Sequence, residues 1–255
     1  MTVAPVGSGA PRFVLAPSSV VDALYDAVRH RIVNGELAGG EKLTEARLTG
    51  EYGVARTTAK ACLERLTAAG LLRRTAHRTA VVTELGAAEV SDLYFARLAV
   101  EGAAVRRLAE RRELPATATA AQAQVVSAVD AHDFPKQAEA DMAFHAALVN
   151  GAGSERLIRM HGLIMGEVHL TMGQSRAHVV PGRSAVGDEH DAILAAVLAG
   201  DAAGAVVALE THLAHAQSRV QARLARAAAQ QDVQQDAQHE AQQDAQQPAD
   251  PGAAN

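Results

Sequence analysis

The sequence predicts a mainly α-helical protein in two parts: a small head of three helices and a hairpin, followed by an antiparallel helical bundle. Hydrophobic residues make up 48% of the 255 positions, but aromatic residues make up only 3%, so Leu and Ala must fill the core, and both favour helices. Apolar residues recur with the period of a helix along both parts. Strand-like alternation with β-branched residues is concentrated in Leu71–Thr75 and Thr79–Thr83, which predicts one hairpin.

The head is expected to span residues 17–83. Its apolar stripes predict a first helix that ends at Asn34-Gly35, a short second helix capped by Thr44, and a third helix from about Arg56 to Ala69. The two hairpin strands follow, joined by Ala76-His77-Arg78. Three helices followed by a hairpin is the element order of a winged helix-turn-helix.

The second part is expected to span residues 84–226 and to contain only helices. Helices joined by short loops pack as an antiparallel bundle around one core. The flanking segments have no apolar stripe: residues 1–16 predict a disordered arm, and residues 227–255 form a low-complexity Gln/Ala/Asp tail that can extend the last helix. The expected helices are 87–112, 116–130, 135–150, 154–173, 185–199 and 202–226.

Charge is distributed unevenly along the chain. The whole sequence carries −5, but residues 17–83 hold ten Lys and Arg against seven Asp and Glu, a balance of +3, whereas residues 84–225 hold twelve against seventeen. A basic module beside an acidic one can meet phosphate with one end only. The single Cys62 excludes a disulfide framework, and no membrane span or export signal is recognisable, so a soluble cytoplasmic protein is expected.

The third helix of the head has the composition of a DNA-reading helix. If Ala59, Leu63 and Leu66 point inward, the opposite face presents long cationic donors, which can bond the O6 and N7 atoms of guanine in the major groove. Cations on the second helix and at the hairpin tip can reach the backbone or minor groove. The alternative is that these are solvated surface charges. The expected DNA-contacting residues are Arg47, Arg56, Thr57, Thr58, Lys60, His77 and Arg78.

The head resembles the GntR family of bacterial repressors. The resemblance implies a homodimer that binds a palindromic operator, with the third helix in the major groove and the wing in the minor groove. It is carried by Ile32-x-x-Gly35-x-Leu37, Gly40-x-x-Leu43, Leu48, Tyr52-Gly53-Val54-Ala55-Arg56-Thr57-Thr58, Leu63-x-x-Leu66 and Gly70-Leu71-Leu72.

Four positions depart from that family pattern. Ala55 replaces the usual Ser before the reading helix and removes an N-cap oxygen worth roughly 1 kcal/mol. Thr58 replaces a Pro, and Lys60 replaces an Arg and gives up bidentate geometry. Thr79 replaces the wing Gly and cannot approach a groove floor as closely. We therefore expect DNA binding, but with an operator sequence and a depth of wing insertion that differ from those of the family pattern.

Four polar residues are expected to point into the apolar core of the bundle. Asp141 and His145 lie one turn apart on one helix face, and His190 and His212 each share a face with apolar residues. Unpaired, each group would cost on the order of 1–3 kcal/mol, whereas a shared divalent cation would satisfy them together. The alternative is that each is an ordinary hydrogen-bonded core residue.

The second part resembles the FadR-like subgroup, which has an FCD-type all-helical effector domain. The motifs are Asp141-Met-Ala-Phe144-His145, Glu189-His190-Asp-Ala-Ile193-Leu194 and His212-Leu213. The resemblance implies that Asp141, His145, His190 and His212 ligate a metal that accepts a carboxylate effector, and that Arg97, in Arg97-x-x-x-Glu101, pairs with that carboxylate. The donor set suits zinc, nickel or another first-row ion. Further candidates for lining the pocket are His161, His169, His178, Arg183 and His215.

Three functions are weighed. The leading one is a ligand-responsive transcriptional regulator, a repressor released by a small organic acid. The second is a regulator for which the ion itself is the signal. The third is a metal hydrolase, since an open metal site can activate water. No His-Glu-x-x-His motif, nucleophile elbow or phosphate loop is present, and Glu189, the nearest candidate base, is expected to point away from the cluster, so we do not expect an enzyme.

Overall fold

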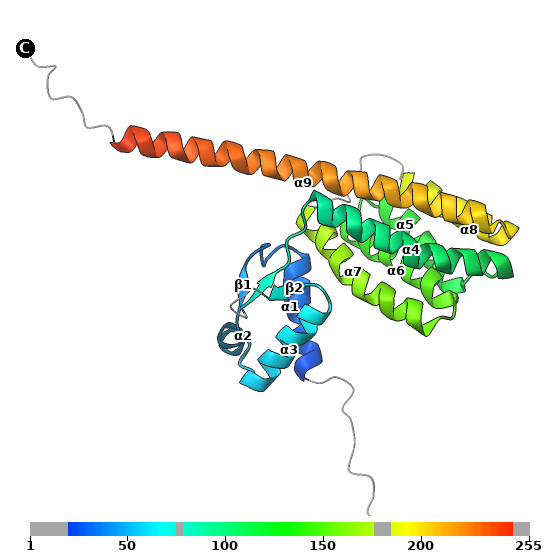
Figure 1. The fold of residues 1–255 in the computed structure, drawn as a ribbon, viewed down its shortest axis with the longest axis horizontal. Coiled ribbons are helices and arrows are strands. Elements are labelled where there is room, and N and C mark those ends of the chain that lie inside the picture. Colours follow the sequence, from blue (N-terminus) through cyan, green and yellow to red (C-terminus); the bar gives the residue numbers. More distant parts are fainter. Residues whose placement is uncertain (1–19, 75–78, 176–184, 247–255) are drawn as a thin grey trace, which may run out of the picture.

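The computed structural model describes residues 20–74, 79–175 and 185–246 (Figure 1). It shows a small N-terminal head beside a larger helical domain, and a long last helix that crosses this domain and extends beyond it. The predicted arm at residues 1–16 and four candidate residues lie outside the described residues: His77, Arg78, His178 and Arg183.

The head is a winged helix-turn-helix, as the sequence predicts. Its three strands form an antiparallel sheet in the order β1-β3-β2, with Lys42 of β1 opposite Val81 of β3. The strand β1 was not predicted, because a two-residue strand has no alternation to detect. The elements are α1 (Val20–Val33), β1 (Lys42–Leu43), α2 (Glu45–Tyr52), α3 (Arg56–Ala68), β2 (Leu72–Arg74) and β3 (Ala80–Val82).

Local signals explain the helix boundaries of the head. The Thr44 side chain accepts a hydrogen bond from the Arg47 backbone N–H and caps α2, which ends at Gly53 in the left-handed conformation (φ 65°). The helix α3 begins after Ala55, which is extended but offers no side-chain cap. Cys62 of α3 lies in the core of the head, and burial raises its pKa to about 11.

The helical domain is built around α4 (Ala87–Arg111), which packs against α6, α7, α8 and α9. The last helix continues past the expected bundle boundary at residue 226 to Gln246, so the low-complexity tail extends it, as the sequence analysis allows. The reason is composition: Ala and Gln favour helix even where no apolar face is buried. The other helices are α5 (Ala116–Asp130), α6 (Phe134–Gly151), α7 (Glu155–Ser175), α8 (Ala185–Ala199) and α9 (Ala202–Gln246).

The two domains meet where α7 contacts α1 and α3. An Arg29 side-chain nitrogen (Nη2) lies 3.2 Å from Nε2 of His169, whose Nδ1 lies 2.8 Å from the Met165 carbonyl oxygen. Gly166 faces the backbone of Ala69 so closely that any side chain there would collide with it. One apolar cluster runs from the head into the helical domain. The junction between the two domains is therefore closely packed.

Candidate effector site and DNA-reading surface

Four buried side chains from three helices converge in the middle of the helical domain. Asp141 and His145 come from α6, His190 from α8 and His212 from α9. One ligand atom from each lies within 4.8 Å of the others. His145 and His190 have no exposed surface at all. The convergence expected from the sequence is thus present in the structure.

Each of the three imidazoles is oriented by an oxygen at its Nδ1 atom. Because an oxygen acceptor at Nδ1 holds the ring proton there, each Nε2 presents its lone pair toward the centre of the cluster. Metal-ligating histidines are oriented in this way by their outer partners. The pairs are His145 with Glu101 Oε2 (2.7 Å), His190 with Gln122 Oε1 (2.9 Å) and His212 with Glu189 Oε2 (2.8 Å).

The inward-facing nitrogens lack ordinary partners. The Nε2 atoms of His145 and His212 lie 3.1 Å apart, and both present lone pairs when both Nδ1 atoms carry the protons. Nε2 of His190 is 3.3 Å from an oxygen of Asp141, yet it has no hydrogen-bond partner among the described residues. Two facing lone pairs and an orphaned buried nitrogen are unfavourable without a cation. Three imidazoles and one carboxylate fit a divalent first-row ion.

The protonation states also fit a metal. Burial and the positive charge of Arg97 lower the pKa of His145 to about 3. Burial likewise lowers the pKa of His212. Burial opposes the ionisation of Asp141, but contact with His190 and the nearby imidazoles hold the pKa of Asp141 well below its usual range. Neutral imidazoles and an ionised carboxylate are the forms that bind metals.

Glu101 links the cluster to two further groups. Its Oε1 accepts a hydrogen bond from Nε of Arg97 at 2.7 Å and lies 3.2 Å from Nε2 of His161, while its Oε2 lies against His145. Burial opposes ionisation of Glu101, but the Arg97 guanidinium holds the pKa of this carboxyl well below its usual range. The Arg97 side chain is completely buried, and its Nη2 has no hydrogen-bond partner in the described parts of the chain. A buried N–H group of this kind suits a carboxylate oxygen.

The sequence did not identify the orienting residues. Glu101 was noted only in the spacing with Arg97, and Gln122 was not singled out. The expectation that Glu189 points away from the cluster is wrong: it holds Nδ1 of His212 and also contacts His215. His169 lies at the domain junction, away from the cluster. No local pattern reveals these partners, because each pair joins different helices.

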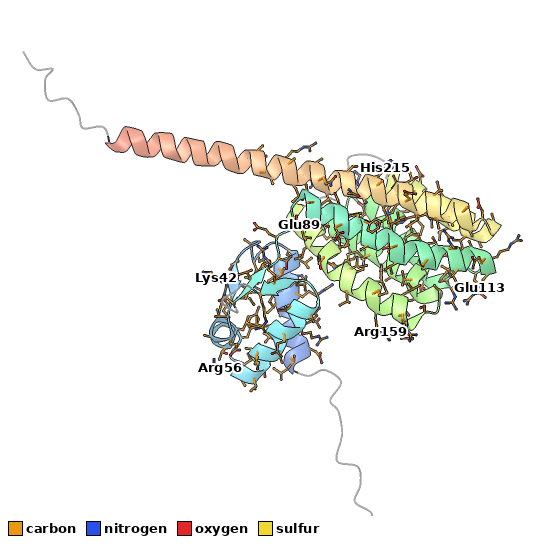
Figure 2. All side chains as sticks on the ribbon, viewed as in Figure 1. Lys42, Arg56, Glu89, Glu113, Arg159 and His215 are labelled. Atoms are coloured by element: carbon orange, nitrogen blue, oxygen red, sulfur yellow. The ribbon has the colours of Figure 1, made fainter. Side chains whose placement is uncertain are left out.

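The face of α3 that the sequence predicts to read DNA is exposed. The side chain of Arg56 is 84% exposed and that of Lys60 is 61% exposed, and Thr57 lies exposed beside them. Figure 2 places Arg56 at the end of the head that points away from the helical domain. Arg56 donates from Nε to Glu45 at 2.7 Å, an exposed ion pair that a phosphate or base can replace. Thr58 is half-buried on the same turn.

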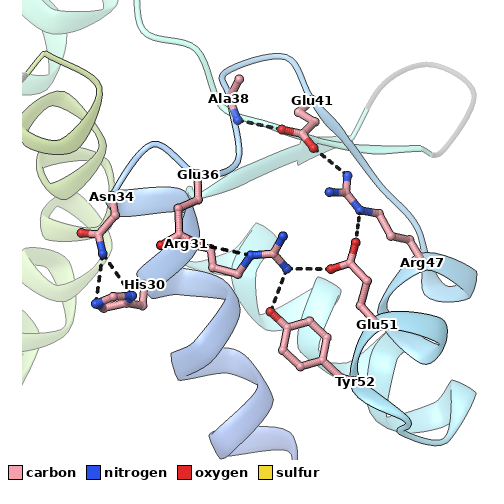
Figure 3. A network of polar contacts seen from close by, with 9 residues as sticks. All are labelled: His30, Arg31, Asn34, Glu36, Ala38, Glu41, Arg47, Glu51 and Tyr52. Atoms are coloured by element: carbon pink, nitrogen blue, oxygen red, sulfur yellow. Dashed lines mark hydrogen bonds and ion pairs between the residues drawn. The ribbon is translucent and has the colours of Figure 1, made fainter.

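Arg47 is bound within the head. It donates to Glu41 at 2.8 Å and to Glu51 at 2.7 Å, and Glu51 also accepts from Arg31 (Figure 3). This network ties α1 to α2 and to the turn before β1, so Arg47 has a structural role, and its contact with DNA stays a prediction. Two exposed cations not singled out before, Lys42 and Arg73, flank Val81 on the sheet.

These features define a DNA-binding transcriptional regulator with a helical C-terminal domain. A model of the gntR family of bacterial regulatory proteins matches residues 21–82, and a model of the FCD domain matches residues 92–215. The chain belongs to the GntR family, and its FCD domain is that of the FadR-like subgroup. It is a regulator and not an enzyme, so the hydrolase reading is set aside.

Two curated relatives carry similar descriptions. The chain is 31% identical over 134 residues to an uncharacterized HTH-type transcriptional regulator in the TAR-I ttuE-ttuC' intergenic region of Agrobacterium vitis, a match covering 51% of this chain and 78% of that protein. It is 27% identical over 203 residues to the uncharacterized HTH-type transcriptional regulator BphR of Paraburkholderia xenovorans (strain LB400), covering 76% and 82% respectively.

Solved structures show the same fold. A putative transcriptional regulator GntR from Rhodococcus sp. RHA1 superposes with a TM-score of 0.68 at 22% identity, covering 80% of this chain and 98% of that one. McbR/YncC of E. coli superposes with a TM-score of 0.65 at 19% identity, covering 82% and 98%. Within the described residues, no helix is both long enough and apolar enough to cross a membrane.

Proposed function

We propose that the protein is a repressor that binds a palindromic operator as a homodimer and is released when a small carboxylate binds in the helical domain at a metal site. The observation that carries the proposal is the set of four converging buried ligand atoms, each imidazole oriented by its own oxygen partner. A protein that acts on chromosomal DNA works in the cytoplasm, at the nucleoid.

Asp141, His145, His190 and His212 would hold the metal, with zinc and nickel as the leading candidates. Bound there, the ion would supply open coordination positions to a carboxylate. The orphaned Nη2 of Arg97 would donate to the same carboxylate in a charge-assisted hydrogen bond. An organic acid is therefore the effector class that the charge and donors of the site favour.

The link to DNA runs through Glu101. A carboxylate that takes up Arg97 competes with Glu101 for the same guanidinium, and Glu101 also holds His161 on α7. The helix α7 in turn touches the head at Ala69 and Arg29. A ligand shifts the DNA-binding equilibrium only if it binds two arrangements of the protein with different affinities. The proposed arrangements differ in whether Arg97 pairs with Glu101 or with the bound carboxylate.

The alternative regulator reading is that the metal is itself the signal. It is favoured by the complete set of protein ligands and orienting partners, which needs no effector to be assembled. Titration of DNA affinity with zinc or nickel alone, and then with a set of mono-, di- and tricarboxylic acids, separates the two readings. If metal alone gives the full response and acids add nothing, the carboxylate proposal is overturned.

The metal centre is tested by elemental analysis of protein purified without chelators. About one first-row metal per chain is expected for the wild type, and its loss is expected for His190→Ala. The matched control is His215→Ala, because His215 also contacts Glu189 but lies outside the cluster and is largely exposed. Equal metal content in wild type and His190→Ala would overturn the site.

The reading surface is tested by operator binding. A duplex selected by the protein from a random library provides the probe. Arg56→Ala and Lys60→Ala are each expected to cost about 1–3 kcal/mol of binding, roughly 5- to 150-fold in affinity. Arg106→Ala, which removes an exposed cation of the helical domain, is the control. Unchanged affinity in both α3 variants would exclude α3 as the reading helix.

A further inference from the structure

The outer face of the head's sheet carries two cations, one on each side of its central strand. Lys42 of β1 and Arg73 of β2 both lie opposite Val81 of β3. Residues directly opposite one another share a face of the sheet, and neighbours along a strand alternate between faces. The residues on the inner face belong to the apolar core of the head: Leu43, Leu72, Ala80 and Val82. Lys42, Arg73 and Val81 therefore point to the outer face, where both cations are exposed.

Neither cation has a counterion in the described part of the chain. No hydrogen bond or ion pair joins the amino group of Lys42 or the guanidinium of Arg73 to another described residue. The carboxylate nearest to Lys42 along the chain is engaged elsewhere, because Glu41 accepts hydrogen bonds from Arg47 and from the Ala38 backbone N–H. Other cations of the head have carboxylate partners: Arg31 and Arg47 contact Glu51, Arg56 contacts Glu45, Lys60 contacts Glu64, and Arg65 contacts Asp22.

The position of this face relates it to the predicted reading helix α3. Figure 2 labels Lys42 and Arg56 along the same edge of the head, the edge that faces away from the helical domain. The Lys42 carbonyl oxygen accepts a hydrogen bond from Nη1 of Arg47 at 3.1 Å, which fixes β1 to α2, the helix before α3. The junction with α7 uses a different part of the head, at Arg29 and Ala69. DNA held at α3 can therefore extend to the sheet without meeting the helical domain.

The chemistry of this face suits the phosphate backbone of DNA. Lys42 and Arg73 gain a counterion when they meet phosphate, whereas Arg56 must first give up its ion pair with Glu45. The two cationic residues lie on either side of β3, so their backbones are about 10 Å apart, and their long side chains can reach separate phosphates. Val81 between them is buried and offers no polar group to a base edge. Contacts of this kind add affinity and fix the position of a protein on DNA, but they carry no sequence information.

We propose that Lys42 and Arg73 form a phosphate clamp on the outer face of the sheet, which holds the DNA backbone beside the base pairs that α3 reads. The clamp is separate from the segment that joins β2 to β3, where the wing tip is expected to enter the minor groove. The inference goes beyond the proposed function, because it requires only that the head binds DNA and needs neither a metal nor an effector.

The salt dependence of DNA binding tests the clamp. Binding of the full chain is measured by fluorescence anisotropy, without added metal or effector, on a duplex selected by the protein and on an unrelated duplex of equal length. Lys42→Ala and Arg73→Ala each remove one phosphate contact, so each is expected to reduce the steepness of log affinity against log salt concentration by about 0.9. At about 0.1 M salt this corresponds to roughly 8-fold weaker binding, by the same factor on both duplexes.

Two control variants separate the charge from other effects, and circular dichroism checks that each variant is folded. Lys42→Arg keeps the charge and is expected to bind both duplexes as the wild type does. Arg106→Ala removes an exposed cation of the helical domain and is expected to change neither the salt dependence nor the affinity.

Three results would overturn the proposal. The first is an unchanged salt dependence in the double variant Lys42→Ala, Arg73→Ala. The second is a loss of affinity confined to the selected duplex, which would indicate that these side chains read bases. The third is tighter DNA binding by the double variant, which would indicate that the face holds an acidic segment of the chain instead.

Discussion

Gly166→Ala places one methyl group in the domain junction. An ideal Cβ at Gly166 would lie 2.0 Å from the backbone oxygen of Ala69 and 3.2 Å from its carbonyl carbon. An ordinary carbon–oxygen contact needs roughly 3.2 Å, so α7 and the end of α3 must separate by about 1 Å. Because the obstacle is backbone, no side-chain rotation relieves it. Overpacking of this kind costs typically about 1–3 kcal/mol.

The same change at Gly162 provides a matched control. Gly162 lies one turn earlier on α7, and a Cβ there meets nothing within 4 Å. Both substitutions gain roughly 0.5–1 kcal/mol of helix propensity. Gly162→Ala should therefore raise the free energy of unfolding by that amount, whereas Gly166→Ala should lower it by about 1 kcal/mol.

Urea unfolding of the full chain, followed by circular dichroism, measures both variants. The midpoint is expected to rise for Gly162→Ala and to fall for Gly166→Ala, with unchanged slopes. A Gly166→Ala protein as stable as the Gly162→Ala protein would refute the packed junction between α7 and the head. It would also remove the route by which the effector site is proposed to reach DNA.

Three further outcomes are expected. Burial and the charge of Arg29 lower the pKa of His169 from 6.5 to about 4. The unfolded state therefore binds the proton first as the pH falls, and the wild type loses up to about 3 kcal/mol of its free energy of unfolding between pH 6.5 and 4. His169→Gln should lose less over that range in urea unfolding, and an equal loss would contradict the buried contact. Gln122→Ala should weaken metal affinity about 10- to 100-fold by releasing His190, measured by competition with a chelator, and unchanged affinity would show that the amide does not orient the ring. Ala55→Ser should raise the free energy of unfolding by about 1 kcal/mol, because residue 55 already has an extended N-cap backbone without a capping oxygen. An unchanged free energy in thermal unfolding would mean that the hydroxyl does not reach the N–H groups of α3.

The sequence predicted the helices and the converging residues because both follow from the helical spacing of apolar and polar residues. Asp141 and His145 share a face at one-turn spacing, and the stripes around His190 and His212 fix which way these side chains point. The orienting partners are not predictable in this way. Gln122 lies on α5 and holds a ring of α8, and only the packing of the two helices brings them together.

Two other differences have the same origin. The short strand β1 exists only through pairing with β3, a long-range contact that no local pattern encodes. Arg47 has the charge and length that a DNA-contacting residue needs, yet its guanidinium is bound by Glu41 and Glu51. Local periodicity predicts the direction in which a side chain points from its helix, whereas the contacts that the side chain makes depend on tertiary packing.

The central claim is that occupancy of the site formed by Asp141, His145, His190 and His212 sets the affinity of the head for DNA. Fluorescence anisotropy on a selected operator duplex tests it most directly, with wild type and His190→Ala measured side by side with zinc or nickel, with and without the set of carboxylic acids. Metal with acid is expected to weaken DNA binding by the wild type, typically 5- to 150-fold for an allosteric coupling, and to leave DNA binding by His190→Ala unchanged. An equal response of the two proteins, or no response of the wild type to any combination, would contradict it.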